Sequence, residues 1–209
     1  MRRSITAAIT ALAATAAWAL SAGPAPAYPP TPPSAGTAAT QLASLTVKAE
    51  GSTTGYSRDL FPHWITQSGT CDTRDQVLKR DGTGVTVDSQ CEPTAGRWYS
   101  VYDATWVEDD SSVDIDHIVP LAEAWKSGAN AWTTARRQQF ANDLSISQLI
   151  AVSASSNRSK GDKDPSAWKP TNMSVHCIYA REWIWVKYTY GLSLQSAEKT
   201  ALQQMLATC

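Results

Sequence analysis

A short stretch near the middle of the 209-residue chain carries residue types that hydrolytic chemistry needs. It reads D-I-D-H-I-V-P over residues 114–120 and places Asp116 directly before His117. Consecutive side chains of a strand point to opposite faces, so both can reach one site only if the backbone bends before Pro120. With such a bend, Asp116 could hold a hard cation while His117 stays beside it as an unliganded base. Alone, the stretch is equally consistent with exposed acids and a histidine at a strand end.

Two polar stretches downstream strengthen the interpretation. Asn142 and Asp143 follow an amphipathic segment, and S-N-R-S-K-G-D occupies residues 156–162. Together with residues 114–120, these stretches resemble the HNH endonuclease family, whose site is a ββα-metal element of two strands, one helix and a single divalent ion. The order, the spacing and the proline after the histidine agree with that family, including an N-R-x-K run like that of the HNH domain in RNA-guided CRISPR nucleases.

The resemblance is closer still to the exported bacterial HNH branch related to the C-terminal domains of GmrSD-type restriction enzymes. This chain contains the motifs of that branch, D-H-I-V-P-L-x-x-A-W, F-A-N-D-L, N-x-S-K-G-D and W-x-P. The resemblance covers roughly residues 56–209. It implies a single α+β domain over residues 37–209, built around a ββα-metal (HNH) element with flanking helices and a small sheet.

The resemblance also implies a role for each matched position. His117 would be the general base that takes a proton from the attacking water, because an imidazole titrates near neutral pH. Asp116 and Asn157 would bind the ion, and Asn142 would orient the histidine or its loop. One carboxylate and one amide oxygen, completed by water and phosphate, favour Mg²⁺ or Mn²⁺ over Zn²⁺.

The implied activity is metal-dependent hydrolysis of phosphodiester bonds in DNA, with RNA as a second candidate substrate. Little sequence specificity is expected, because phosphate contacts position a protein without reading bases and no base-reading motif is found. Arg158 and Lys160, inside the matched motif, are the main candidates for phosphate contacts. Lys163 is a weaker candidate, since a solvated charged face explains it equally well.

Five further residues could serve the site or only the structure. Asp114 shares a strand face with Asp116, so it either supports the ion's ligands or is simply solvated. Glu123 falls in the first turn of a predicted helix, where an acid favours the helix dipole, and it could also lie near the metal. Arg58 and Arg74 are further candidates for phosphate contacts, although nothing local distinguishes them from partners in surface salt bridges. His63 is expected to pack in an aromatic cluster.

Apolar spacings predict the elements that must position these residues. Strands are predicted at residues 85–87, 97–102, 104–107, 114–119 and 147–152. Helices are predicted at residues 37–50, 74–80, 121–126, 132–140, 153–160, 175–190 and 193–208. The tryptophans beyond Trp18 are scattered along the chain and are expected to fill the core rather than to form a binding platform.

The N-terminus predicts export. Residues 1–27 combine a basic start, an apolar run over residues 5–20 and a small-x-small cleavage signal, Ala25-Pro26-Ala27, which is typical of a secretory signal peptide. Residues 28–36 are rich in proline and predict an extended leader that is not packed. No later stretch is long and apolar enough to cross a membrane, so we expect a secreted, extracellular protein without a membrane partner.

The cysteines agree with export. Cys71, Cys91, Cys177 and Cys209 make an even number and allow three pairings. We favour Cys71–Cys91 with Cys177–Cys209, because each pair closes a short loop within one half of the chain. A structural zinc site is disfavoured because no C-x-x-C pair is present.

Charge and motif content limit the alternatives. Loss of residues 1–27 removes two arginines and shifts the formal net charge from −1 to −3, so no global attraction to polyanions is expected. Neither a G-x-S-x-G nor a Walker-type motif is present, which disfavours esterases and nucleoside triphosphatases. We expect a monomer acting on DNA; the alternatives are a non-catalytic exported binding module on the same scaffold and an antibacterial toxin nuclease.

Overall fold

The computed structural model describes residues 29–209, which form short helices and three small antiparallel sheets; the expected signal peptide lies outside the described residues. The helices are α1 (Ala35–Ser44), α2 (Thr73–Asp81), α3 (Leu121–Ser127), α4 (Thr134–Ala141), α5 (Ala154–Lys160), α6 (His176–Tyr190) and α7 (Ser196–Leu206). The strands are β1 (Thr66–Ser68), β2 (Cys71–Asp72), β3 (Gly82–Val87), β4 (Pro93–Ser100), β5 (Thr105–Val107), β6 (Val113–His117) and β7 (Leu149–Ser153). The sheets pair β1 with β2, β3 with β4 and β5, and β6 with β7, so the predicted α+β class is confirmed.

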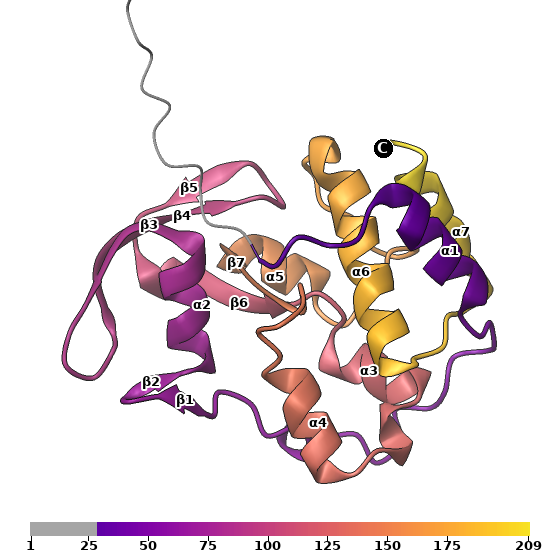
Figure 1. The fold of residues 1–209 in the computed structure, drawn as a ribbon, viewed down its shortest axis with the longest axis horizontal. Coiled ribbons are helices and arrows are strands. Elements are labelled where there is room, and N and C mark those ends of the chain that lie inside the picture. The colour runs from indigo at the N-terminus through magenta and orange to yellow at the C-terminus, as the bar shows by residue number, and fades with distance from the viewer. Residues whose placement is uncertain (1–28) are drawn as a thin grey trace, which may run out of the picture.

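The β6–β7 pair lies between two differently built parts of the molecule. Figure 1 shows α2 and the β3–β4–β5 sheet on one side and α1, α6 and α7 on the other. A larger hydrophobic cluster fills the helical part and includes Phe61, Phe140 and Trp183, while a smaller one under α2 includes Leu78 and Trp98. Most of the tryptophan side chains therefore pack in or against the core, as predicted, although Trp106 is 46% exposed.

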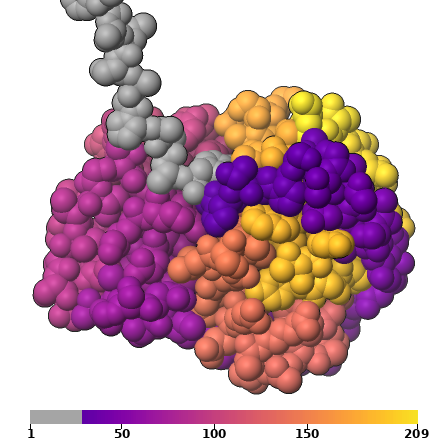
Figure 2. All heavy atoms as spheres, viewed as in Figure 1, coloured from indigo at the N-terminus to yellow at the C-terminus, as the bar shows by residue number. Residues whose placement is uncertain are grey.

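Residues 29–34 of the proline-rich leader are extended but packed, which corrects the prediction that the leader is not packed, and residues 35–36 already belong to α1. The Ser147 hydroxyl donates to the Pro30 carbonyl at 2.5 Å. Arg181 of α6 donates to the carbonyls of Pro33 and Pro32 at 2.7 and 2.9 Å. Proline lacks an N–H but keeps its carbonyl, so these acceptors fix the leader without any ladder. Figure 2 shows the N-terminal segment lying across the helical part.

The first predicted helix is shorter than expected. α1 ends at Ser44 rather than near residue 50, and the following residues are extended. Val47 forms a parallel bridge with Leu194, and the Lys48 N–H donates to the Leu194 carbonyl at 2.9 Å. Hydrogen bonds to a segment distant in the sequence therefore replace the helix that the local apolar spacing predicts after Ser44. No helix within residues 29–209 has the length and apolar character that a membrane span requires.

The β6–β7 pair and α5 form one continuous unit. The strands are antiparallel, with Asp116 opposite Ile150 and His117 opposite Leu149. α5 begins directly after β7, where the Ser153 hydroxyl caps it by accepting from the Ser156 N–H. This connection brings a polar helix next to the end of the strand that carries Asp116 and His117.

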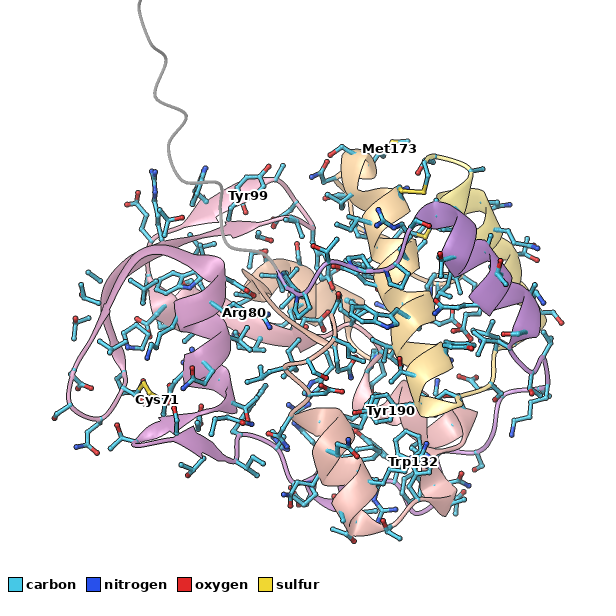
Figure 3. All side chains as sticks on the ribbon, viewed as in Figure 1. Cys71, Arg80, Tyr99, Trp132, Met173 and Tyr190 are labelled. Carbon is cyan, nitrogen blue, oxygen red and sulfur yellow. A yellow bond between two sulfur atoms is a disulfide. The ribbon has the colours of Figure 1, made fainter. Side chains whose placement is uncertain are left out.

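Both predicted disulfides are confirmed. Cys71 of β2 is bonded to Cys91, and Cys177 of α6 to Cys209 at the C-terminus. Figure 3 shows the first bond beside the labelled Cys71. In the same view Arg80 projects from α2 toward the centre of the molecule, and its guanidinium donates to the Leu149 carbonyl of β7 at 2.5 Å. One disulfide thus closes a loop in the sheet part and the other closes a loop in the helical part.

Candidate active site

A pocket of about 190 Å³ opens where β6 ends, α3 begins and α5 ends. β6 ends at His117, so the pocket borders both His117 and the preceding Asp116 although neighbouring strand residues point to opposite faces. Four residues with a role predicted from the sequence line it: Asp116, His117, Asn157 and Arg158. The central grouping that the sequence predicts is therefore brought together.

His117 is buried with one ring nitrogen bound. Its Nε2 lies 2.9 Å from the Ala141 carbonyl, which can only accept, so Nε2 carries the hydrogen. Within residues 29–209, Nδ1 has no hydrogen-bond partner, and it is the nitrogen with the free lone pair. The Trp64 indole stacks on the imidazole with ring centroids 5.6 Å apart and planes inclined by 25°. Trp64 adopts a left-handed backbone conformation (φ 56°) that residues other than glycine rarely occupy.

The surroundings of His117 keep it neutral. Burial lowers the pKa of His117 to about 3, against the opposing effect of the Ala141 carbonyl. The positive charge of Arg58 also lowers this pKa. A neutral imidazole with a fixed tautomer and a free Nδ1 can accept a proton from a ligand in the pocket.

The charge of Asp116 is balanced inside the protein. The Lys160 ammonium donates to Asp116 Oδ1 at 2.9 Å, and the Tyr102 hydroxyl donates to Oδ2 at 2.6 Å. Burial raises the pKa of the Asp116 carboxyl, and Lys160 opposes that shift. A carboxylate offers about four lone-pair directions, so each oxygen keeps one for a further ligand.

Lys160 differs from its predicted role as a phosphate contact. Its side chain is fully buried, and the ammonium also donates to the His117 carbonyl at 2.8 Å. The lysine points inward because an unpaired buried Asp116 would cost several kcal/mol. Lys160 therefore binds the side chain of the predicted metal ligand Asp116 and the backbone of His117 instead of facing solvent.

Asn157 presents an amide oxygen to the pocket. Its Nδ2 donates to Asp114 Oδ2 at 3.1 Å, which directs the amide group, and Oδ1 makes no hydrogen bond to residues 29–209. Asp114 thus contacts Asn157 directly, and a supporting role for it stays a prediction. Arg158 is 74% exposed and its Nε lies 3.7 Å from Asp114 Oδ2, so this contact leaves most of its guanidinium free.

The oxygen donors of the pocket fit a hard divalent ion that takes only a few of its ligands from the protein. Asp116 retains lone pairs and Asn157 offers a free amide oxygen in the same pocket, which are the oxygen ligands that Mg²⁺ and Mn²⁺ prefer. The part of the chain that the structure describes contains no group of three or more His, Cys, Asp or Glu side chains suited to a metal. Such an ion would therefore keep much of its water or bind a phosphate oxygen.

Asn142 lies outside the pocket but supports it. Its Nδ2 donates to the carbonyls of Pro62 at 2.8 Å and Gln138 at 2.7 Å, and its Oδ1 accepts from the Thr73 hydroxyl at 2.7 Å. It directly follows Ala141, whose carbonyl binds His117. Asn142 thereby fixes the backbone next to the carbonyl that holds the imidazole, and its orienting role stays a prediction.

Two predicted residues are not brought to the pocket. Glu123 is buried against Lys187, with Oε1 2.8 Å from the ammonium, so it serves helix packing rather than an ion. Lys163 is exposed, and its ammonium donates to the Ser159 carbonyl at 2.6 Å. Neither residue lines the pocket.

Two further polar residues line the pocket: Arg58, which was only one of several undistinguished candidates for phosphate contacts, and Asp162, which had no predicted role. Arg58 comes from a distant segment, and no local pattern distinguished it from other arginines. Asp162 ends the matched S-N-R-S-K-G-D stretch, so the motif itself contained a signal for it.

With this geometry, the comparisons with known proteins define the class. Residues 72–205 match the family model described as "GmrSD restriction endonucleases, C-terminal domain". The chain therefore belongs to this family, which indicates a nuclease-like function. An "Uncharacterized secreted protein" of Arthroderma benhamiae is 60% identical over 169 residues, covering 80% of this chain and 82% of the relative. No solved structure shows a significant match. The relative's name and the two disulfides agree with export, and the protein is secreted.

Proposed function

We propose that this protein is a secreted, metal-dependent endonuclease that hydrolyses phosphodiester bonds of DNA with little sequence specificity. One observation carries the proposal: a neutral histidine with a free Nδ1 lines the same pocket as a carboxylate and an amide oxygen. The family membership supports a nuclease, and the pocket contains the groups that hydrolysis of a phosphodiester needs. RNA is a second substrate to be tested.

His117 is the proposed general base. Its Nε2–H is fixed on the Ala141 carbonyl, so Nδ1 accepts the proton of the attacking water. An anionic phosphate in the pocket raises the pKa of the imidazole and so favours this transfer. Trp64 covers one face of the ring and limits its rotation and solvation.

Asp116 and Asn157 are the residues that would hold a divalent ion, Mg²⁺ or Mn²⁺. When bound, such an ion supplies Lewis-acid stabilisation of the charge on the phosphate and the leaving oxygen. The Lys160 and Tyr102 hydrogen bonds fix the Asp116 carboxylate, and Asp114 fixes the Asn157 amide. These contacts preorganise both oxygens before substrate arrives.

The test is cleavage of plasmid DNA by purified mature protein with Mg²⁺, with Mn²⁺ and with EDTA. We expect nicking and linearisation with metal, none with EDTA, and loss of activity in His117→Ala and His117→Gln. His176→Ala is the matched control, because this histidine lies at the start of α6 and is not among the pocket residues. Melting curves establish that each variant is folded.

Two outcomes would contradict the proposal. Cleavage that persists in EDTA and in folded His117 variants would exclude the assigned chemistry. DNA binding without cleavage under any metal would favour a non-catalytic exported binding module on the same scaffold.

A further inference from the structure

A segment outside the family match contributes one residue, Arg58, to the lining of the pocket. We call residues 56–65 the N-terminal strap; the family match begins at residue 72. The strap contains the short 3-10 helix η1 (Arg58–Leu60), whose first residue lines the pocket. It therefore supplies a side chain that the matched domain does not.

The strap is fixed to the body at successive residues. The Arg137 guanidinium donates to the Leu60 carbonyl at 2.8 Å. Phe61 is fully buried in the larger hydrophobic cluster. Asn142 accepts from the Ile65 N–H at 3.2 Å and also donates to the strap's Pro62 carbonyl. A segment held at four of its ten residues places its side chains reproducibly.

The Arg58 guanidinium is held on one edge and free on the other. Its Nε donates to His63 Nε2 at 3.2 Å. His63 Nδ1 lies 2.9 Å from the Phe61 carbonyl, so Nδ1 carries the hydrogen and Nε2 is an acceptor. Neither terminal nitrogen of Arg58 has a hydrogen bond or ion pair with residues 29–209. Two fixed contacts therefore orient a guanidinium whose remaining donors have no partner in the described chain.

The other basic residues near the site lie close to carboxylates. Lys160 is buried and paired with Asp116, and Arg158 approaches Asp114. Arg58 is thus the pocket cation that has no carboxylate within ion-pair distance in residues 29–209. Its positive charge also reaches His117, whose pKa it lowers.

We propose that Arg58 is a phosphate-binding residue of this site, delivered by the N-terminal strap. The inference rests on the proposed endonuclease function and adds the group that binds the anion. The planar guanidinium of Arg58 can donate two parallel N–H bonds to two phosphate oxygens, which a lysine ammonium cannot do in the same geometry. The strap also brings Trp64 onto His117, so one segment positions both the base and the anion.

The first experiment measures binding without turnover. Affinity for a short DNA duplex is determined in EDTA at several salt concentrations for wild type, Arg58→Ala and Arg58→Lys. Loss of one phosphate contact reduces the slope of log K against log salt concentration by about 1, so we expect this change in Arg58→Ala but not in Arg58→Lys. Arg97→Ala is the matched control, because this exposed arginine stacks on Trp106 and is not among the pocket residues.

The second experiment measures cleavage by the same variants. We expect Arg58→Ala to lower kcat/KM by about 10²-fold, Arg58→Lys to lie between it and wild type, and Arg97→Ala to match wild type. Melting temperatures that stay close to wild type exclude unfolding as the cause. Equal slopes and equal kcat/KM for Arg58→Ala and Arg97→Ala, in a background where wild type cleaves and His117→Ala does not, would overturn the assignment of Arg58 alone. Absence of cleavage by wild type would instead contradict the proposed function.

Discussion

At the scale of single residues, the site depends on charges that are balanced before any ligand binds. Asp116 is 4% exposed and its carboxylate is met by the Lys160 ammonium and the Tyr102 hydroxyl. Breaking such a buried pair leaves an uncompensated charge, which costs more than the intact pair contributes. The charge and position of the predicted metal ligand Asp116 therefore depend on Lys160, a residue with no exposure to solvent.

Lys160→Met is expected to lower the free energy of unfolding by about 3–5 kcal/mol, because it leaves Asp116 buried and unpaired. Asp116→Asn combined with Lys160→Met should recover part of that loss, since no charge remains to be buried. Lys163→Met is the matched control and should change stability by less than about 0.5 kcal/mol, because Lys163 is exposed. Urea unfolding monitored by circular dichroism measures all three. Equal stabilities for Lys160→Met and Lys163→Met would contradict the account of Asp116.

Asp114→Ala is expected to weaken metal use without unfolding the protein. Its carboxylate accepts from Asn157 Nδ2, and losing that contact frees the amide to turn its oxygen away from the pocket. Removing a residue that orients a metal ligand typically costs about 10–100-fold in metal affinity or activity. The measurement is the Mg²⁺ concentration that gives half-maximal cleavage. Asp114→Asn, which keeps an acceptor oxygen, should lie between wild type and Asp114→Ala, and Glu108→Ala, at an exposed acid, should not change it. An unchanged metal requirement in Asp114→Ala would show that Asp114 is only solvated.

At the scale of elements, local patterns predict what lies within one helix or strand and miss what long-range contacts assemble. β6, β7 and α5 lie close to their predicted ranges because each has its own periodicity or cap, and they bring Asp116, His117 and Asn157 together. The strap could not be predicted in the same way, because its hydrogen bonds to Arg137 and Asn142 join residues 77 to 80 positions apart. No local pattern shows which side of Arg58 faces a pocket.

The helices of the C-terminal half share a buried charge cluster. Lys187 of α6 lies 2.8 Å from Glu123 of α3 and 2.9 Å from Glu198 of α7. Glu198 also accepts from the Trp183 indole N–H at 2.6 Å. Burial raises the pKa of Glu198 to about 7, opposed by the positive charge of Lys187 and reinforced by the negative charge of Glu123. The two carboxylates therefore share the Lys187 ammonium, and Glu123 also lies 3.1 Å from the Lys126 ammonium.

This cluster predicts a pH dependence that Glu198→Gln removes. A carboxyl whose pKa rises from 4.5 in the unfolded chain to about 7 in the folded protein favours folding when protonated. The stabilisation of the folded protein by this carboxyl is complete below pH 4.5 and is lost as the pH rises through about 7. Stability of wild type relative to Glu198→Gln should thus fall by roughly 3 kcal/mol over that range. Urea unfolding of both proteins at several pH values measures the difference, in which the titration of groups that do not interact with Glu198 cancels. A difference that stays constant or rises with pH would contradict the raised pKa.

At the scale of the whole molecule, neither the net charge nor the disulfides contribute directly to the site. The mature chain is expected to carry a net charge of −3, so contacts with a polyanion depend on the local cations Arg58 and Arg158 rather than on overall attraction. Short loops and an exported chain were enough to predict both disulfides, since each joins residues within one half of the sequence. None of the four cysteines lines the pocket.

Removing either disulfide is therefore expected to lower stability while sparing the chemistry. The bonds join residues separated by 20 and 32 positions, and the chain-entropy model gives roughly 3–4 kcal/mol for loops of these sizes, with the longer loop contributing about 0.4 kcal/mol more. For a protein of this size, such a loss lowers the melting temperature by roughly 10 °C. Cys71→Ser with Cys91→Ser, and Cys177→Ser with Cys209→Ser, are compared with wild type by calorimetry and by DNA cleavage at 25 °C. The cleavage rate should stay within about twofold of wild type, because both bonds lie outside the pocket. The disulfides would be excluded as a source of stability if the melting temperature were unchanged in both double variants and in wild type under reductant. Lost cleavage in a variant that is still folded at 25 °C would show that the site depends on the cross-link itself.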